Sequence, residues 1–262
     1  MSLLIARRGI LAAGAAPAVP EPSGDYAAEV AADSPDWWLR LSETSGATAA
    51  DEVGTNDGTV TGANLDVASF ADTGSAASFD GTDDRIDVPH DALLNAGDLF
   101  TFECLVKLDN PGADGLQVIA DKTGLSSGNG QWGIWWDNRS SQGSPQRLRF
   151  QVSDAPSTTG PNFAQLEGAS IASAIGNGIH IVGTFERTAS TSVKLFVDGS
   201  EEATSTSGTV SAPDSSNTRT VYIANMAGSF WLGGILDEPA IYHKLLAPVR
   251  IAAHATAAGL GS

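Results

Sequence analysis

Three of the six tryptophans in this 262-residue chain lie close together, beside charged residues. Side chains alternate between the two faces of a strand, so Trp132 and Trp136 would share one face and Trp135 the other. An indole on an open face beside Asp137 or Arg139 could stack on a sugar ring while these side chains hydrogen-bond to its hydroxyl groups. Three interpretations of these five residues stay open: a glycan-binding platform, a subunit interface, or the hydrophobic core.

A pair of arginines forms a second candidate for binding. Arg147 and Arg149 are separated by one residue, so they point to the same face of their predicted strand. Guanidinium groups bind carboxylates through charge-assisted hydrogen bonds. The pair therefore predicts an interface with the carboxylates of a neighbouring subunit, and a solvated strand face is the alternative.

The acidic residues show no spacing typical of a catalytic centre. Glycoside hydrolysis needs two carboxyl groups on either side of the scissile bond, and on one strand they would have to alternate to share a face. Asp87 and Glu103 are each the only acid in a strand-like run, and Asp237 and Glu238 are direct neighbours. We therefore expect that the protein is not an enzyme and has no catalytic residue.

The histidine and cysteine residues show no spacing typical of a transition-metal site. No two of the histidines have the separation of a metal-ligand motif; they are His90, His180, His243 and His254. The single cysteine, Cys104, can form neither an internal disulfide nor a cysteine-based zinc site. A chain of this size without disulfides fits a bacterial or phage protein better than a secreted animal module.

Alternating apolar and polar residues predict the strands that must position these side chains. The clearest runs are 100–108, 147–152, 179–185 and 193–197, and Asp198-Gly199 predicts a tight turn after the last of them. Short strands separated by Gly, Asp, Asn and Ser over some 200 residues are typical of a two-sheet antiparallel sandwich. The exception is 249–258, where Pro248 and Gly259 predict the start and the end of a helix.

Six sequence blocks also occur in one order that is similar to a known family. They are Trp38–Gly46 with Ala50-Asp51, Ala77–Gly81 with Arg85–Pro89, Phe100–Glu103, His180–Phe185, Leu195–Gly199, and Gly234–Glu238 with Ile241-Tyr242. Together they resemble the laminin-G-like, concanavalin-A-like jelly-roll domains from about residue 35 to residue 259. The resemblance implies an all-β fold, a two-sheet antiparallel jelly-roll sandwich. Because this fold carries lectins, adhesion modules, glycanases and structural domains, it leaves function open.

The resemblance also implies a metal. Family members hold Ca²⁺ at the rim of the sandwich, and Asp51, Asn56 and Asp237 match the positions of the ligands. Calcium prefers six to eight hard oxygen ligands, which these side chains and nearby glycine carbonyls could supply. The alternative is a solvated turn, with Asp237 hydrogen-bonded to backbone N–H groups.

Charge divides the chain into an arm and a body. With 14 Lys+Arg against 31 Asp+Glu, the net charge is −17, which excludes general nucleic-acid binding and argues against an anionic membrane surface. The basic residues Arg7 and Arg8 lie in an Ala/Gly-rich leader, which we interpret as an assembly arm, a weak signal peptide being the alternative. We expect an extended N-terminal arm over 1–33, and a jelly-roll domain over 34–262 that ends in a short helix.

Two functions of different classes follow from these features. The first is a non-enzymatic structural or decoration protein of a phage head or tail, anchored through its arm to other virion proteins or to copies of itself, as in a trimer, and able to bind host glycans. The alternative is a secreted or cell-surface carbohydrate-binding module that depends on calcium. The corresponding locations are the virion, or the extracellular space or bacterial surface.

Overall fold

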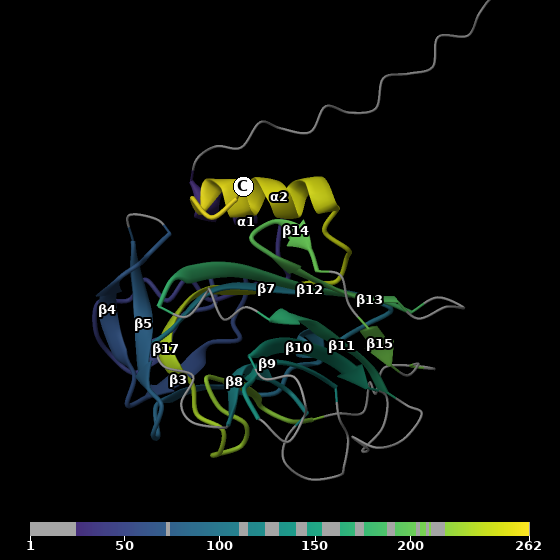
Figure 1. Ribbon diagram of the computed structural model, residues 1–262. Helices are drawn as coiled ribbons and strands as arrows, with labels where there is room; N and C mark the ends of the chain where they lie inside the picture. Colours follow the sequence, from purple (N-terminus) through teal and green to yellow (C-terminus); the bar gives the residue numbers. More distant parts are fainter. Residues whose placement is uncertain are drawn as a thin grey trace, which may run out of the picture.

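Two antiparallel sheets pack face to face in the computed structural model (Figure 1). The structure describes residues 25–71, 74–109, 115–123, 131–139, 146–153, 163–170, 176–187, 192–202, 205–207, 210 and 218–261. Arg7 and Arg8 lie outside these residues. Neither described helix is long and apolar enough to cross a membrane.

The upper sheet in Figure 1 has eight strands, and the strand predicted over 100–108 is at its centre. In spatial order the strands are β14 (Ser200–Glu201), β13 (Ser192–Val197), β12 (Gly178–Glu186), β7 (Leu99–Leu108), β17 (Gly233–Tyr242), β5 (Ser75–Asp80) and β4 (Asn64–Ala68), and β1 (Trp37–Trp38) pairs with β17. Asp198 and Gly199 both have positive φ, +49° and +82°, so the predicted Asp-Gly turn between β13 and β14 is confirmed.

The lower sheet has nine strands. Their order is β15 (Ser205–Ser207), β11 (Phe163–Ser170), β10 (Arg147–Ser153), β9 (Trp132–Asp137), β8 (Leu116–Asp121), β16 (Val221–Ile223), β6 (Arg85–Val88), β3 (Gly58–Thr61) and β2 (Thr48–Ala49). A short 3-10 helix, η1 (Ala92–Leu94), lies between β6 and β7. Its last residue, Leu94, accepts a 2.9 Å hydrogen bond from Trp132 Nε1 through its carbonyl oxygen.

The core lies between the two sheets and follows the predicted alternation. On β7, Phe100, Phe102, Cys104 and Val106 belong to the main core cluster, whereas Leu105 faces the other way. Trp132 and Trp136 are fully buried in the same main cluster. The prediction that these two tryptophans take part in a glycan-binding or interface surface is therefore wrong, because they fill the space between the sheets.

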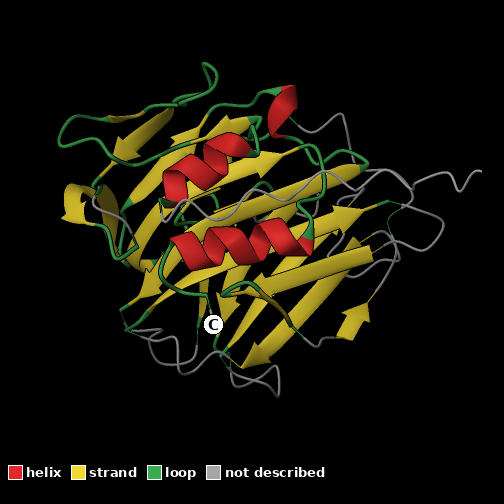
Figure 2. Cartoon of the chain, turned by 90° about the horizontal axis from the view of Figure 1, so that it is seen from above, coloured by secondary structure: helices red, strands yellow, loops and turns green. Residues whose placement is uncertain are grey.

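Two helices cover the outer face of the eight-stranded sheet. These are α1 (Tyr26–Ala32) and α2 (Pro248–Ala257), which lie side by side across the strands (Figure 2). Tyr26, Val30 and Ile251 form a second apolar cluster with residues of the sheet such as Val182 and Phe196. The C-terminal helix was predicted, with Pro248 in its first turn and Gly259 at φ +72° after its end.

Helix α1 corrects the expected arm over 1–33. The Asp25 side chain accepts a hydrogen bond from the Ala28 N–H and caps the helix, while Tyr26, Ala27 and Val30 are buried against the sheet. A seven-residue helix is too short to be stable alone, so its packing on the sheet supplies the stability that its sequence lacks. Residues 25–33 are thus part of the folded domain.

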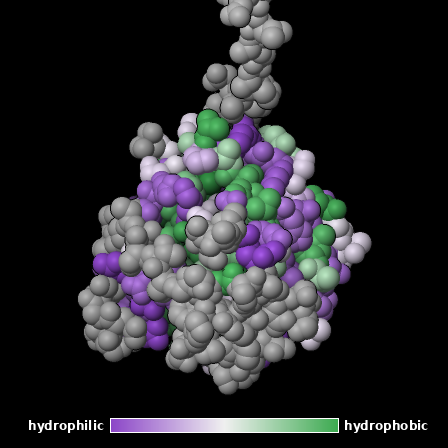
Figure 3. Space-filling view, turned by 90° about the vertical axis from the view of Figure 1, so that its right-hand side faces the viewer, coloured by the Kyte–Doolittle hydropathy of each residue, from purple (hydrophilic) through white to green (hydrophobic). Residues whose placement is uncertain are grey.

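Figure 3 shows one side of the molecule, where hydrophobic and hydrophilic residues are interspersed among the described residues. These residues form no large apolar patch on that side. The exposed large apolar side chains of the described residues come from different segments, and they are Val53, Leu99, Phe230, Leu245 and Val249. Single exposed apolar residues are normal on a protein surface.

Candidate functional site

A row of mostly polar residues crosses the outer face of the nine-stranded sheet. Register partners in an antiparallel sheet point to the same face, and one chain of partners runs over seven neighbouring strands, β3, β6, β16, β8, β9, β10 and β11. Its members, in that order, are Thr59, Asp87, Tyr222, Asp121, Gly133, Gln151 and Gln165. We call it the polar row. The sequence neighbours of these residues, such as Ile86, Ile223 and Ile134, point into the core.

An indole ring lies beside the centre of the polar row. Trp135 is on the outer face, as the alternation predicts, and packs with Val118, Met226 and the half-buried Leu116. A Cβ atom added to Gly133 would lie 2.4 Å from Cζ3 of Trp135, so the ring covers this glycine. Because Trp135 is only 7% exposed, its ring mainly supports the row and offers little open surface for stacking.

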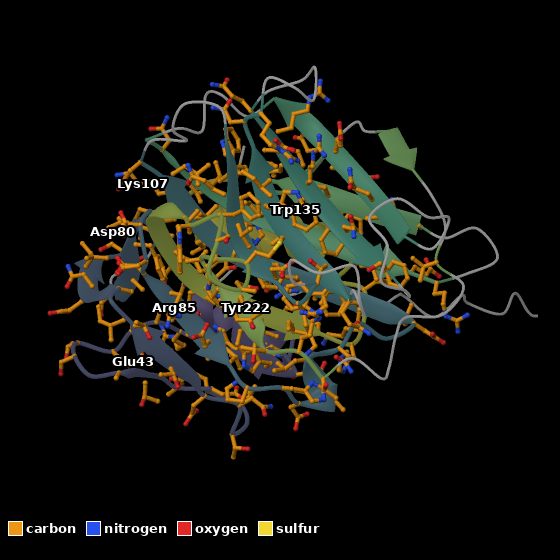
Figure 4. The ribbon with its side chains drawn as sticks, turned by 90° about the horizontal axis from the view of Figure 1, so that it is seen from below. Glu43, Asp80, Arg85, Lys107, Trp135 and Tyr222 are labelled. Atoms are coloured by element: carbon orange, nitrogen blue, oxygen red, sulfur yellow. The ribbon has the colours of Figure 1, made fainter. Side chains whose placement is uncertain are left out.

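Tyr222 and the Arg85–Asp87 pair form the more open end of the polar row. Figure 4 shows this sheet from below, with Tyr222 and Arg85 close together and Trp135 farther along. Arg85 Nε lies 2.9 Å from Asp87 Oδ2, and about a third of each of these two side chains is exposed. Tyr222 is half-buried and has Asp87 as its register partner on one side and Asp121 on the other.

Ion pairs link β9, β10 and β11 at the end of the row away from Tyr222. Asp137 is almost fully buried, with Arg139 Nη2 2.6 Å and Arg149 Nε 3.1 Å from its Oδ2. Arg149 Nη2 also lies 2.8 Å from Glu167 Oε1 on β11. Burial alone would raise the pKa of Asp137, but the hydrogen bonds from Arg139 and the charge of Arg149 outweigh it and lower this pKa. Asp137 is therefore held as a carboxylate.

The predicted arginine pair does face outward, but Arg149 binds carboxylates of its own chain. Asp137 and Glu167 come from the two strands that flank β10, so they reach Arg149 without any neighbouring subunit. Arg147 is half-buried and its Nη1 donates a 3.2 Å hydrogen bond to the carbonyl of Gly168. The prediction that Arg149 meets a neighbour's carboxylates is corrected by these contacts.

Sequence comparison places the fold among known families. Residues 80–252 match a laminin-G-type family model described as the concanavalin A-like lectin/glucanases superfamily. The chain belongs to this superfamily. Its six blocks and its two-sheet sandwich are those expected from the resemblance. No curated protein matches the chain.

Solved structures with the superfamily's sandwich fold are similar over most of the chain. A Trypanosoma rangeli sialidase in complex with sialic acid is 17% identical, with a TM-score of 0.57 over 86% of this chain and 33% of the sialidase. Domain 4 of AbnA, a GH43 extracellular arabinanase from Geobacillus stearothermophilus in complex with arabinotriose, is 18% identical, with a TM-score of 0.53 over 79% of this chain and 92% of the domain. The chain thus spans about a third of the sialidase. At these identities the likeness shows the fold alone.

The calcium positions implied by the superfamily are engaged in hydrogen bonds within the chain. Asp51 Oδ1 accepts bonds from the N–H groups of Trp38 and Val53, and its Oδ2 accepts one from Asn56. Asp237 Oδ2 accepts a 2.6 Å bond from the Ser69 hydroxyl. The calcium site therefore stays a prediction, and Asp51 has a structural role of its own.

Potential ligand groups of another kind lie elsewhere. Among the described residues, two sets of three His, Cys, Asp or Glu side chains have ligand atoms within 4.8 Å of one another: Asp80, Asp83 and Asp84, and Glu103, His180 and His254. Neither set contains Asp51 or Asp237. The first set is largely exposed, whereas the second is fully buried.

Sequence reasoning missed Tyr222, Asp121, Gln151 and Gln165 of the polar row. The signal at Tyr222 is a three-residue alternation in β16, with Val221 and Ile223 buried on either side, which is too short to be distinguished from chance. Asp121 is obscured by the irregular pairing of β8 with β9 between Val118 and Ala120. A one-residue shift in register changes the face of every following side chain, so only the structure could align the row.

Proposed function

We propose that this protein is a non-catalytic carbohydrate-binding module that holds an oligosaccharide along the polar row. The observation that carries this proposal is the row itself, because it aligns the half-buried Tyr222 and Gln165 with a partly exposed Arg85–Asp87 pair across one sheet face. Gln151, between them in the row, is buried. Sugars offer apolar ring faces for aromatic contacts and hydroxyl groups for planar hydrogen-bonding groups. The fold supports the proposal, since the similar arabinanase domain carries arabinotriose.

The absence of catalysis is part of the proposal, and the electrostatics of the face support it. A glycoside hydrolase needs a carboxyl group that stays protonated as the general acid and a second one across the bond. Here Asp137 has a lowered pKa beside Arg139 and Arg149, Glu167 pairs with Arg149, and Asp87 pairs with Arg85. Asp137 is therefore held in its charged form, while Glu167 and Asp87 are engaged in ion pairs.

Binding would be measured by isothermal titration calorimetry with arabinotriose, and by a glycan array read with Ca²⁺ and again with a chelator. We expect Tyr222→Ala and Arg85→Ala to weaken binding by about tenfold each, which corresponds to about 1.4 kcal/mol. The Ca²⁺ comparison tests whether binding needs the predicted ion. The same mixtures, analysed by chromatography, should contain no shorter products.

Arg187→Ala is the matched control for Arg85→Ala. Both arginine side chains are 33% exposed and each pairs with one aspartate, but Arg187 follows β12 in the other sheet and binds Asp98. Arg187→Ala should bind like the unaltered protein. Equal losses in the two arginine variants, or an array without any signal, would contradict the proposed site.

A location outside the cell, or on its surface, is proposed together with this function. The virion role predicted from the sequence depends on an arm whose residues 1–24 lie outside the described residues, and no comparison supports that role. It stays a prediction, as do a trimer and contacts with other virion proteins.

A further inference from the structure

A buried polar cluster lies on the side of the molecule opposite the polar row, between the eight-stranded sheet and the helices. Glu103 on β7, His180 on β12 and His254 on α2 are all fully buried. Glu103 Oε2 is 3.1 Å from His180 Nε2 and 3.0 Å from His254 Nδ1. Three side chains from segments far apart in the sequence thus converge on one point.

The groups around these three residues resemble the outer shell of a metal centre. His254 Nε2 lies 2.9 Å from Asp33 Oδ2, and the Tyr242 hydroxyl donates a hydrogen bond to Glu103 Oε1. Arg250 in turn holds Asp33, with Nε 2.7 Å from its Oδ2. Metal-binding histidines commonly donate their second N–H to a carboxylate, which fixes the ring and its tautomer.

One polar atom beside the cluster adds an independent observation. The hydroxyl of Tyr26 is buried and has no hydrogen-bond partner in the part of the chain that the structure describes. The Tyr26 ring packs edge-on against both imidazoles, with centroid distances of 5.6 Å to His180 and 6.0 Å to His254. Buried polar groups normally have partners, so an oxygen without one beside two imidazoles points to a missing ligand.

We propose that Glu103, His180 and His254 bind a divalent ion of the zinc type. Two histidines and one carboxylate are a known zinc ligand set, with bonds of about 2.0–2.2 Å. A tetrahedral ion with such bonds separates its ligand atoms by about 3.3 Å. The observed separations of 3.0 and 3.1 Å from Glu103 Oε2 need only a small expansion. The Tyr26 ring packs against both histidine ligands.

Charge favours a divalent ion at this place. The carboxylates of Glu103, Asp33 and Glu29 carry three negative charges, and Arg250, which contacts Glu29 and Asp33, carries one positive charge. When the ion binds, His254 gives up its Nδ1 proton to solvent and keeps the Nε2 proton for Asp33, while His180 carries its proton on Nδ1. The ion then offsets the negative charge that remains beside Arg250 and beside the Lys244 ammonium, which donates a hydrogen bond to the Asp33 carbonyl. This matters because uncompensated buried charge is costly.

Such an ion would join the C-terminal helix to the two central strands of the sheet. His254 is the only one of the three ligands that belongs to a helix, so the ion would cross-link α2 to β7 and β12. Binding to the folded state alone raises stability by mass action. The site is separate from the polar row, and this proposal holds whether or not the protein binds glycans.

The test uses the full chain, stripped with a chelator and then equilibrated with Zn²⁺ or Co²⁺. Elemental mass spectrometry should find one zinc per chain, and Co²⁺ should give the visible absorption of a low-symmetry, four-coordinate site. Zinc should raise the melting temperature. Arg85→Ala should bind zinc normally even if it has lost glycan binding.

Four variants decide the assignment. His180→Ala and His254→Ala should lose the cobalt spectrum. Asp33→Asn, which removes only the carboxylate that contacts His254 Nε2, should weaken zinc binding by about 10–100-fold. His243→Ala is the control, since this histidine lies outside the cluster and contacts the Asn95 carbonyl. If His254→Ala does not fold, His180→Ala and Asp33→Asn still test whether the ion binds at this cluster. A folded protein that takes up neither ion, or a His243 variant that loses the spectrum equally, overturns the proposal.

Discussion

The indole ring of Trp135 lies over Gly133, two residues earlier on the same strand. An added Cβ at Gly133 would come within 2.4 Å of Trp135 Cζ3 and 2.9 Å of Asp121 Oδ1. These distances are far below a normal van der Waals contact, so any side chain larger than hydrogen must displace the ring. Gly133 is therefore the member of the polar row that the Trp135 ring covers.

Replacing this glycine should disturb both stability and the proposed site. We expect Gly133→Ala to lower the free energy of unfolding by about 1–3 kcal/mol, because overpacking forces neighbouring side chains to shift. Urea unfolding measures the loss, and near-ultraviolet circular dichroism reports the changed setting of Trp135. Gly97→Ala is the control, since its added Cβ would meet only the Leu99 carbonyl oxygen, at 3.7 Å. Equal stability of the two variants would contradict the close approach.

A buried carboxyl group predicts an unusual dependence of stability on pH. Trp38 Nε1 donates a 2.5 Å hydrogen bond to Glu238 Oε2, and Arg40 Nε donates one of 3.1 Å to Oε1. Burial, and then the charge of Asp237, raise the pKa of Glu238 to about 8, and the contacts with Arg40 and Trp38 only partly offset this. The folded state therefore keeps a proton that the unfolded chain has released.

The difference in proton binding between the folded and unfolded states determines whether stability rises or falls with pH. Between the unfolded pKa of 4.5 and the folded pKa of about 8, the folded state binds more protons, so its stability falls as the pH rises. The slope from this one group is at most about 1.4 kcal/mol per pH unit. Glu238→Gln should remove that slope. Urea midpoints of both proteins over this range measure the difference, and parallel pH profiles would show that the Glu238 pKa is not raised.

Much of the fold could be predicted because its signals are local. The alternation in 100–108 and 147–152 follows from having one strand face on the core, and Pro248 and Gly259 mark the ends of α2 through their own backbone preferences. The faces of Trp132, Trp135 and Trp136 follow from the same alternation. The alternation does not show which of the two faces is buried, because burial depends on where the second sheet packs.

The cluster around Glu103 could not be predicted, because it depends on tertiary contacts. His180 is 77 residues and His254 is 151 residues away from Glu103 in sequence, so no spacing pattern connects them. Helix α1 was missed for a related reason. Its seven residues form a helix because Tyr26 and Val30 are buried against the sheet, and no local signal shows that contact.

The two helices should depend on one arginine for their mutual attachment. Arg250 on α2 is mostly buried, and its Nη2 lies 2.5 Å from Glu29 Oε2 on α1 and its Nε 2.7 Å from Asp33 Oδ2. Arg250→Met leaves two carboxylates without this partner, and we expect a loss of about 1–3 kcal/mol. Hydrogen exchange should then speed up in α1 before it does in β7. Unchanged exchange in α1 would show that apolar packing alone holds the helix.

Asp51 has a structural role that can be tested separately from the predicted calcium site. Its carboxylate accepts backbone N–H bonds from Trp38, Val53 and Asn56, so Asp51→Ala leaves three donors without this acceptor. We expect a loss of about 1–3 kcal/mol even in a chelator, because buried donors without an acceptor keep their desolvation cost. Asp109→Ala, at an exposed position outside both sets of potential metal ligands, is the control.

Calcium titration of the same proteins completes this test. If Asp51, Asn56 and Asp237 bind the predicted ion, Ca²⁺ should raise the melting temperature of the unaltered protein and of Asp109→Ala, because an ion that binds only the folded state stabilises it by mass action. Asp51→Ala should show no such rise. A melting temperature that is the same with Ca²⁺ and with a chelator would remove calcium from the rim and leave Asp51 as a backbone-binding residue, since its hydrogen bonds need no ion.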